Sequence, residues 1–248
     1  NLPAPIKILQ ISDLHDKQFG GSNSFLKEKV KKLAPDLIVL TGDTVSTGGE
    51  KLLSTAKFLR ELCKIAPVVG ILGNHEQRRD VTEFITAAFK AAGVIVLNNE
   101  LVTLNINGTD VNILGLCEHQ AIKRIDYAKS LFGFLNYENH DDQLRELSEC
   151  RGLRILLSHF PENYAKSGNT RYNRFDFTLQ MSGHAHGGQV RLPFVGGVYA
   201  PGQGLFPKYD KGLYKGSHNN LLVSAGLGND SPFPRINNRP TIDMVTFF

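Results

Sequence analysis

The sequence of 248 residues predicts an α/β fold with two β-sheets. In the N-terminal part of the chain, three apolar runs rich in β-branched residues are each followed by a polar loop and an amphipathic helix. That order is typical of a parallel sheet with crossover helices. After residue 93 the apolar runs become shorter and are separated by turns such as Asn107-Gly108, a β-hairpin signal, so we expect a second, more antiparallel sheet.

The first sheet is expected from three strand–loop–helix units. The strands are expected at Ile6–Ile11, 37–40 and 68–72, and the helices at 24–33, 50–64 and Thr82–Ala92. Ser24 is a residue type that caps helix N-termini, and Pro35 cannot continue the first helix. Gly93 suits the left-handed position that follows a helix, so it is expected to end the third.

The second half of the chain is predicted to add shorter strands and one short helix. The strands are expected at 94–97, 101–106, 111–116, Leu153–Leu157, 177–181, 221–225 and 242–247, and the helix at 141–150. Residues 94–97 are assigned to the second sheet. Residues 118–138 are irregular and rich in aromatic residues, and they form either an insertion or lid or ordinary packing against the sheet. Residues 190–214 are loop-rich, with many Gly and Pro, and are too irregular for strands or helices to be assigned there. No repeat or linker divides the chain, so we expect a single domain over residues 1–248.

The composition is that of a soluble globular protein, with 41% hydrophobic and 21% charged residues. A formal charge of +4 favours anionic ligands but is too small to predict a stable nucleic-acid partner. Cys63, Cys117 and Cys150 are odd in number and lack metal-type spacing, which excludes a disulfide framework and a thiolate zinc site. No apolar run approaches the ~18 residues that a membrane span needs.

The chain begins at Asn1 rather than Met, and the residues that follow it, Leu2-Pro3-Ala4-Pro5, have the composition of a linker. We therefore expect an upstream signal peptide or membrane anchor, which would make the protein membrane-associated or exported. A cytoplasmic location is the alternative. No feature of the sequence indicates an oligomeric state.

Residues 181–189, Met-Ser-Gly-His-Ala-His-Gly-Gly-Gln, carry the strongest chemical signal. Two histidines two positions apart follow an apolar run and are bracketed by glycines, which permit positive φ values and close backbone approach. Such a pair of imidazoles is typical of a metal site. The alternative is a glycine-rich turn with two surface histidines.

Four other strand-end loops also deliver metal-binding side chains, which favours the metal site. The complete set is Asp13 and His15, Asp43, Asn74 and His75, His159, and His184 and His186. Carboxyl ends of parallel strands meet at one edge of a sheet, so these residues are expected to lie together. Their oxygen and imidazole ligands favour Mn, Fe, Co or Zn. Two divalent ions against two carboxylates would leave surplus positive charge for a phosphate ester. The remaining histidines, His119, His140 and His218, are expected to be surface or structural.

These motifs, Asp-x-His, Gly-Asp, Gly-Asn-His-Glu, a strand-end His and Gly-His-x-His, resemble in their order the calcineurin-like metallophosphoesterase superfamily. The resemblance extends from Asp13 to His186. It implies a two-sheet αββα sandwich of mixed β-sheets flanked by helices, and two divalent metal ions (Mn, Fe, Zn or Co). It further implies that Asp13, His15 and His186 hold the first metal, that Asn74, His159 and His184 hold the second, and that Asp43 bridges them.

The resemblance also implies a catalytic role for His75, which would donate a hydrogen bond or proton to the phosphate or leaving-group oxygen. The family more often has Asp after this histidine, whereas this sequence has Glu76, whose carboxylate we expect to orient His75. Many relatives have an early glycine after Asp-x-His. Here Asp16-Lys17-Gln18 precede Gly20, which changes the expected shape of the first loop but not its ligands.

The C-terminal motifs indicate a subgroup within this superfamily. Residues 187–193 (Gly-Gly-Gln-Val-Arg-Leu-Pro), 206–209 (Phe-Pro-Lys-Tyr) and 226–228 (Gly-Leu-Gly) resemble bacterial, membrane-associated phosphohydrolases of this superfamily. Some of those relatives cleave the pyrophosphate of a lipid-linked sugar nucleotide. Arg78 and Arg79 are either contacts for a substrate phosphate or part of a solvated helix entry.

The sequence therefore predicts a dinuclear metal-dependent phosphohydrolase that cleaves a phosphodiester or pyrophosphate bond by attack of a metal-activated hydroxide. A lipid-linked or nucleotide-sugar substrate is the hypothesis that the C-terminal motifs suggest. The alternatives are a nucleotide phosphodiesterase or nuclease, and a non-catalytic metal-binding scaffold with the same fold.

Overall fold

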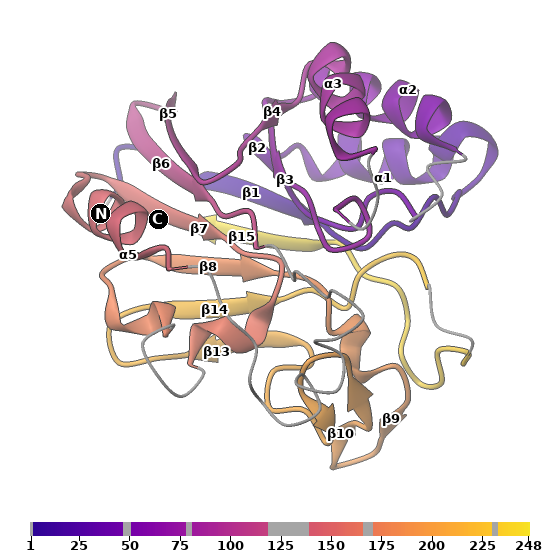
Figure 1. The fold of residues 1–248 in the computed structure, drawn as a ribbon. Coiled ribbons are helices and arrows are strands. Elements are labelled where there is room, and N and C mark those ends of the chain that lie inside the picture. The colour runs from indigo at the N-terminus through magenta and orange to yellow at the C-terminus, as the bar shows by residue number, and fades with distance from the viewer. Residues whose placement is uncertain (1, 47–50, 78–80, 119–138, 166–170, 230–232) are drawn as a thin grey trace.

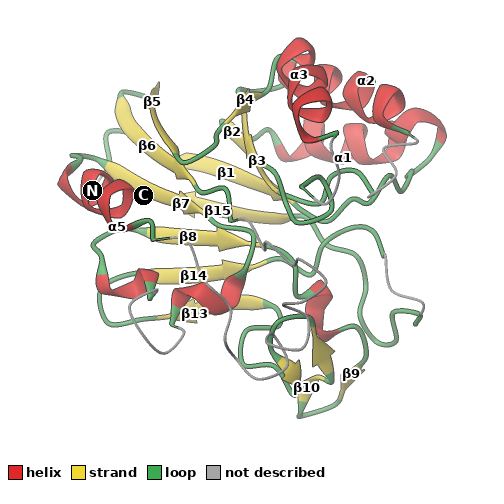
Figure 2. Ribbon diagram, in the orientation of Figure 1, coloured by secondary structure: helices red, strands yellow, loops and turns green. Residues whose placement is uncertain are grey.

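The computed structural model describes residues 2–46, 51–77, 81–118, 139–165, 171–229 and 233–248. In these residues, two mixed β-sheets lie face to face, with helices packed on their outer sides (Figure 1, Figure 2). The predicted αββα sandwich is confirmed. None of the helices in the described part of the chain has the length and apolar character needed to cross a bilayer.

The first sheet follows the predicted strand–loop–helix units. Its strands, in spatial order, are β15 (Asp243–Phe247), β1 (Ile6–Ile11), β2 (Leu37–Thr41), β3 (Val68–Ile71) and β4 (Ile95–Val96). Strands β1 to β4 are parallel, and β15 is antiparallel to β1 at the edge. The outer side of the sheet packs against α1 (Ser24–Leu33), α2 (Leu52–Cys63) and α3 (Thr82–Ala92).

The assignment of residues 94–97 to the second sheet is wrong. Strand β4 pairs in parallel with β3, with Val69 opposite Ile95, and so completes a fourth parallel strand of the first sheet. Val94 and Val96 are buried against the helices. A run this short contains no information about its pairing partner, and the helix before it returns the chain to the sheet it left.

The second sheet has six strands, in the order β13 (Gly212–Lys215), β14 (Asn220–Val223), β8 (Leu179–Ser182), β7 (Leu153–Leu157), β6 (Thr109–Gly115) and β5 (Glu100–Ile106). Only its two edge pairs are antiparallel, so it is less antiparallel than expected. The turn between β5 and β6 has positive φ at both Asn107 (52°) and Gly108 (81°), as the hairpin signal predicts. Helix α5 (Asp141–Glu149) packs on the outer side.

Alternation of side chains along the strands builds the core. In β1, Ile6 and Ile8 point into the layer between the sheets, whereas Leu9 and Ile11 point toward the helices. All residues of β2 are buried, as expected for a central parallel strand covered on both faces. The sandwich therefore has three apolar layers. One lies between the first sheet and its helices, one between the two sheets, and one on the outer side of the second sheet.

Two local predictions are corrected. Ser24 is the first residue of α1 and not its N-cap, which is Asn23, a residue in the left-handed conformation (φ 61°) whose side chain makes no capping bond. Residues 190–214 are more regular than expected. They contain two short hairpins, β9 (Arg191–Leu192) with β10 (Gly196–Gly197) and β11 (Tyr199–Ala200) with β12 (Gly204–Leu205), as well as β13. Gly93 ends α3 at φ 100°, as predicted.

The proposed insertion or lid over residues 118–138 lies outside the described residues except for Glu118 and therefore stays a prediction. The single-domain organisation of residues 1–248 also stays a prediction.

Candidate functional site

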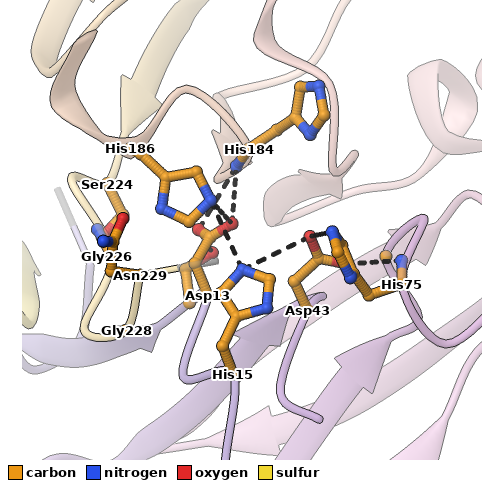
Figure 3. A network of polar contacts seen from close by, with 12 residues as sticks. Asp13, His15, Asp43, His75, His184, His186, Ser224, Gly226, Gly228 and Asn229 are labelled. Carbon is orange, nitrogen blue, oxygen red and sulfur yellow. Dashed lines mark hydrogen bonds and ion pairs between the residues drawn. The ribbon is translucent and has the colours of Figure 1, made fainter. Parts of the chain in front are cut away.

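The five strand-end loops meet at one place, where the carboxyl ends of strands from both sheets converge. Asp13 and His15 follow β1, Asp43 follows β2, Asn74 and His75 follow β3, His159 follows β7, and His184 and His186 follow β8. All are buried except His186, which is partly exposed. Figure 3 shows the imidazoles of His15 and His186 on either side of the carboxylate of Asp13, with Asp43 beside His15.

The backbone of the site is strained. Asp13, His15, Asp43, His184 and His186 all have φ between 47° and 64°, the left-handed region that side chains other than glycine seldom adopt. Two glycines permit the loops to approach. A Cβ at Gly73 would lie 2.3 Å from Asp43 Oδ1, and a Cβ at Gly183 would lie 2.4 Å from Asp13 Oδ2. The glycines of the motifs are therefore required by contact with the two carboxylates.

Asp13, His15 and His186 form a first group of ligand atoms, all within 4.8 Å of one another. His186 Nε2 lies 3.7 Å from Asp13 Oδ1, and it lies 3.3 Å from His15 Nε2. Two imidazole nitrogens at that distance repel unless a proton or a cation lies between them. The backbone N–H of His184 also donates to both oxygens of Asp13, which holds the two loops together.

The histidines of this first group are neutral at pH 7. Burial lowers the pKa of His15 to about 4 against the opposing effect of Asp43 and Asp13. Burial also lowers the pKa of His186 to about 4, and Arg235, whose Nη2 lies 3.2 Å from His186 Nδ1, adds to that shift. Neutral imidazoles offer lone pairs to a metal without first losing a proton.

Asp43, His159 and His184 form a second group. His159 Nε2 lies 3.3 Å from Asp43 Oδ2 and 3.1 Å from Asn74 Oδ1. The imidazole of His184 lies edge-on to that of His159, with ring centroids 5.0 Å apart. The amide oxygen of Asn74 therefore lies beside the second group.

The orientation of His159 is set by its other nitrogen, because Nδ1 donates to the carbonyl oxygen of Thr41 at 2.7 Å. Its Nε2 faces only acceptors, so in the metal-free chain that nitrogen carries a proton. Although burial opposes it, Asp43 raises the pKa of His159 to about 10. In turn, against the opposing effect of burial, His159 and the other imidazoles hold the pKa of Asp43 well below its usual value.

His75 lies at the edge of both groups. Its Nε2 is 3.9 Å from Asp43 Oδ2, its ring lies edge-on to His15 at 4.7 Å, and its backbone N–H donates to Asp43 Oδ1 at 2.9 Å. The backbone contact holds His75 beside Asp43 while its side chain remains close to the metal-binding atoms.

The expectation that Glu76 orients His75 is not supported by the contacts of Glu76. Its carboxylate accepts four backbone N–H groups instead. Oε2 accepts from Asp43 and Gly73, and Oε1 accepts from Thr44 and Val45, at 2.6–3.1 Å. Glu76 therefore joins the loops after β2 and β3. Burial and the charge of Asp43 raise the pKa of Glu76 to about 8, while the N–H donors oppose that rise.

Three further supporting contacts were not predicted from the sequence. Glu118 accepts hydrogen bonds from Ser158 Oγ, Asn163 Nδ2 and Tyr172 Oη and thereby positions the loop that carries His159. Arg235 donates to the carbonyl oxygens of Ala225 and Gly228 beside His186. No local motif marks either residue, because each acts through a loop far away in sequence.

The third contact is a chain of hydroxyl groups behind Asp13. Gln10 donates to Thr41 Oγ1 (2.9 Å), Thr41 donates to Ser12 Oγ (2.7 Å), and Ser12 donates to Asp13 Oδ2 (2.6 Å). A signal for it was present, because Gln10 is a polar residue in an apolar strand at a position that faces the second sheet.

The remaining candidate residues are two described histidines and three residues that the structure does not describe. Arg78, Arg79 and His119 are outside the described residues. His140 is buried edge-on to Tyr172, and His218 is exposed. These two observations agree with structural and surface roles.

The donor set fits divalent metal ions. Within the described residues, two carboxylates, an amide oxygen and imidazole nitrogens converge, and the facing nitrogens of His15 and His186 need either a proton or a cation between them. Oxygen and imidazole ligands are those preferred by borderline and hard divalent metals.

Replacing Glu76 by Gln tests whether its hydrogen bonds hold the loops after β2 and β3 together. Gln supplies one acceptor oxygen, so N–H groups now paired with the second oxygen would face an amide NH₂. Each buried unsatisfied group costs about 1–3 kcal/mol, so we expect the free energy of unfolding in urea to fall by at least ~2 kcal/mol. Glu100→Gln, at an exposed position, is the control. Equal stability of the two variants would contradict the role.

A cation that enters the second group must displace the Nε2 proton of His159, whose folded-state pKa lies above neutrality. At pH 7, titration with Mn²⁺ should therefore release at least one proton per chain. His15 and His186 have none to lose, whereas Glu76, whose pKa is about 8, lies against Asp43 and adds to the release. Calorimetry in buffers of different ionisation enthalpy measures this number. His159→Gln should lower it by about one proton and His218→Gln should leave it unchanged. If the unchanged chain releases no proton, His159 does not carry the Nε2 proton in the metal-free chain.

Comparison with known proteins agrees with this geometry. Residues 6–188 match the family model described as calcineurin-like phosphoesterase. The chain is 30% identical over 232 residues to an uncharacterized metallophosphoesterase, YkuE, of Bacillus subtilis, and this covers 90% of the chain and 72% of YkuE. It is 26% identical over 248 residues to the phosphodiesterase YaeI of Escherichia coli, covering 98% and 82% of the two chains.

Among solved structures, the fold is similar to that of the phosphopantetheinyl hydrolase PptH from Mycobacterium tuberculosis. The TM-score is 0.52 at 14% sequence identity, with 91% of each chain covered. This likeness confirms the fold that the sequence motifs predict. With the family match over three quarters of the chain, the chain belongs to the calcineurin-like phosphoesterase family and is a metal-dependent hydrolase of phosphoester bonds.

Proposed function

We propose that the protein is a dinuclear metallohydrolase that cleaves phosphodiester or pyrophosphate bonds. The observation that carries the proposal is the place of Asp43. Its carboxylate belongs to one cluster with His15 and His75 and to another with His159 and His184. A carboxylate shared in this way can bind one cation through each oxygen.

The proposed ligands follow from the two groups. Asp13, His15 and His186 would hold one ion. Asn74, His159 and His184 would hold the other, with Asp43 between them. The metals are Mn, Fe, Zn or Co by ligand chemistry. When bound, such a pair of ions supplies an activated water and neutralises charge on the phosphoryl oxygens.

The side chains would complete the chemistry. His75, beside Asp43 but outside the proposed ligand sets, would donate a hydrogen bond or proton to a phosphate or leaving-group oxygen. Thr41 and Glu118 would keep His159 in the orientation that its ligand role needs. A non-catalytic scaffold is a weaker proposal, because every ligand and the histidine beside them are present.

The finer substrate class also belongs to the proposal. Similarity to YaeI, described as a phosphodiesterase, supports a diester. A lipid-linked or nucleotide-sugar substrate rests on the C-terminal motifs, and it agrees with a membrane-associated or exported location. We propose no stable nucleic-acid partner, because the chain has a formal charge of only +4.

Asp43→Asn tests the shared carboxylate. The substitution keeps the shape but removes the charge that both groups use, so metal content should fall below that of the unchanged chain. Hydrolysis of bis-p-nitrophenyl phosphate in added Mn²⁺ should fall to background. Elemental analysis and the assay measure the two effects. The control His218→Asn should behave as the unchanged chain, and full activity in Asp43→Asn would refute the two-metal mechanism.

His75→Ala separates catalysis from metal binding. Loss of a proton donor costs about 10²–10⁴-fold in rate, so kcat for the same diester should fall by that factor. The metal content should be unchanged, because all proposed ligands remain. A parallel loss of metal would instead make His75 a ligand, and an unchanged kcat would remove it from the reaction.

A further inference from the structure

Nine large apolar side chains are exposed at one end of the molecule, on the two short hairpins and the segments beside them. They are Leu192, Phe194, Val195, Tyr199, Leu205, Phe206, Leu213, Phe233 and Ile236. We call them the hairpin surface. Phe194 is 109% exposed, so its turn presents a whole aromatic ring to solvent. Figure 1 shows β9 and β10 beyond the edge of the second sheet, apart from its long strands.

The segments that carry the exposed side chains are held in place by hydrogen bonds. Asp210 accepts from Arg191 Nη1 (2.7 Å), the Gly197 N–H (2.7 Å) and Tyr214 Oη (2.8 Å), which ties the first hairpin to the segment before β13. Ile236 exchanges backbone hydrogen bonds with both Gln189 and Arg191. The apolar residues are therefore held in place and are not part of a loose chain end.

The hairpin surface adjoins the candidate metal centre. Val198 N–H donates to the carbonyl oxygen of Gly188, two residues after His186, at 3.1 Å. A cavity of about 460 Å³ opens in the same region, and it is lined mainly by apolar side chains, among them Val190, Val198, Tyr199, Leu205 and Phe233. The family match ends at residue 188, so the hairpins and the C-terminal segment lie outside the matched region.

The charges of this region are almost all positive. Residues 187–218 and 233–241 contain a single carboxylate, that of Asp210, and it is buried in its pair with Arg191. The same two stretches carry the cations Lys208, Lys211, Lys215 and Arg239, besides Arg191, which pairs with Asp210, and Arg235, which is half-buried beside His186. Several alternate along the chain with the exposed apolar residues, since Lys208 follows Phe206 and Leu213 lies between Lys211 and Lys215. The exposed apolar side chains of the hairpin surface therefore have basic residues as their neighbours.

We propose that the hairpin surface docks on an anionic lipid bilayer and places the metal centre beside the membrane. Aromatic and Leu side chains on hairpin tips can enter the acyl region, while Lys and Arg side chains nearby are attracted to the anionic surface of the bilayer. A bilayer accepts a protruding ring without a matching pocket, and its acyl chains suit the apolar cavity. Docking goes beyond the proposed hydrolysis and does not depend on it.

Co-sedimentation with vesicles tests the proposal. The whole chain is mixed with vesicles of phosphatidylcholine alone, or of phosphatidylcholine with 30% phosphatidylglycerol, at ~0.1 M salt. We expect binding to the anionic vesicles, at least tenfold weaker binding to the neutral ones, and release as salt is raised. No binding to either kind of vesicle would overturn the proposal.

A triple variant, Phe194→Ser with Leu205→Ser and Phe233→Ser, should lower the affinity for anionic vesicles at least tenfold. Its matched control is Phe25→Ser with Leu53→Ser and Phe84→Ser, which changes the same residue types at comparably exposed positions (74%, 76% and 66%) on or beside the helices. The control should bind within twofold of the unchanged chain. Equal losses in the two variants would overturn the proposal.

Two further measurements distinguish docking on a bilayer from pairing of two copies of the chain and from a loss of hydrolysis. Light scattering without vesicles should show no difference in mass between the chain and the triple variant. A dimer that the variant dissociates would make a second copy the occupant and overturn the proposal. Turnover of the water-soluble diester is measured in parallel, so failure of the hydrolase proposal would be seen independently of vesicle binding.

Discussion

The buried carboxylate of Asp43, set among imidazoles, is the interaction on which the site depends. A carboxylate removed from water without compensation costs several kcal/mol, and that cost falls when donors and positive charge surround it. His159 provides charge at 3.3 Å, and the backbone N–H of His75 provides a donor at 2.9 Å. Because these partners come from loops of both sheets, the contacts that compensate this carboxylate also join the two sheets at their carboxyl edges.

The two ligand groups are electrostatically unequal. The pKa values of His15 and His186 are lowered to about 4, whereas that of His159 is raised to about 10. The difference follows from position. His159 lies directly against Asp43, while His186 lies next to the cation of Arg235. In the metal-free chain His159 therefore carries a proton at neutral pH, whereas His15 and His186 could bind a cation without first losing one.

Whether a feature of this structure can be predicted from the sequence depends on how far apart in the sequence the interacting residues lie. The candidate metal-binding residues can be predicted to lie together because each follows an apolar strand, and strand ends are marked locally by periodicity and glycine. The position of β4 was missed because a two-residue strand contains too little pattern to choose a sheet. The function of Glu76 was misjudged for a related reason. Its neighbour in sequence is His75, yet its carboxylate bonds to the loop after β2, more than 30 residues away. Glu118 and Arg235 act over similar or longer distances, and no local pattern records such pairings.

The left-handed backbone at the site has a consequence for how such a chain changes over evolutionary time. Holding residues such as Asp13, His15 and Asp43 in that conformation costs of order 1 kcal/mol or more at each position. Glycine there would relax the chain, so the fold on its own favours losing the very side chains that bind cations. Selection for turnover must act continuously against that drift, and a lineage released from such selection would be expected to accumulate replacements that make the protein more stable and inert.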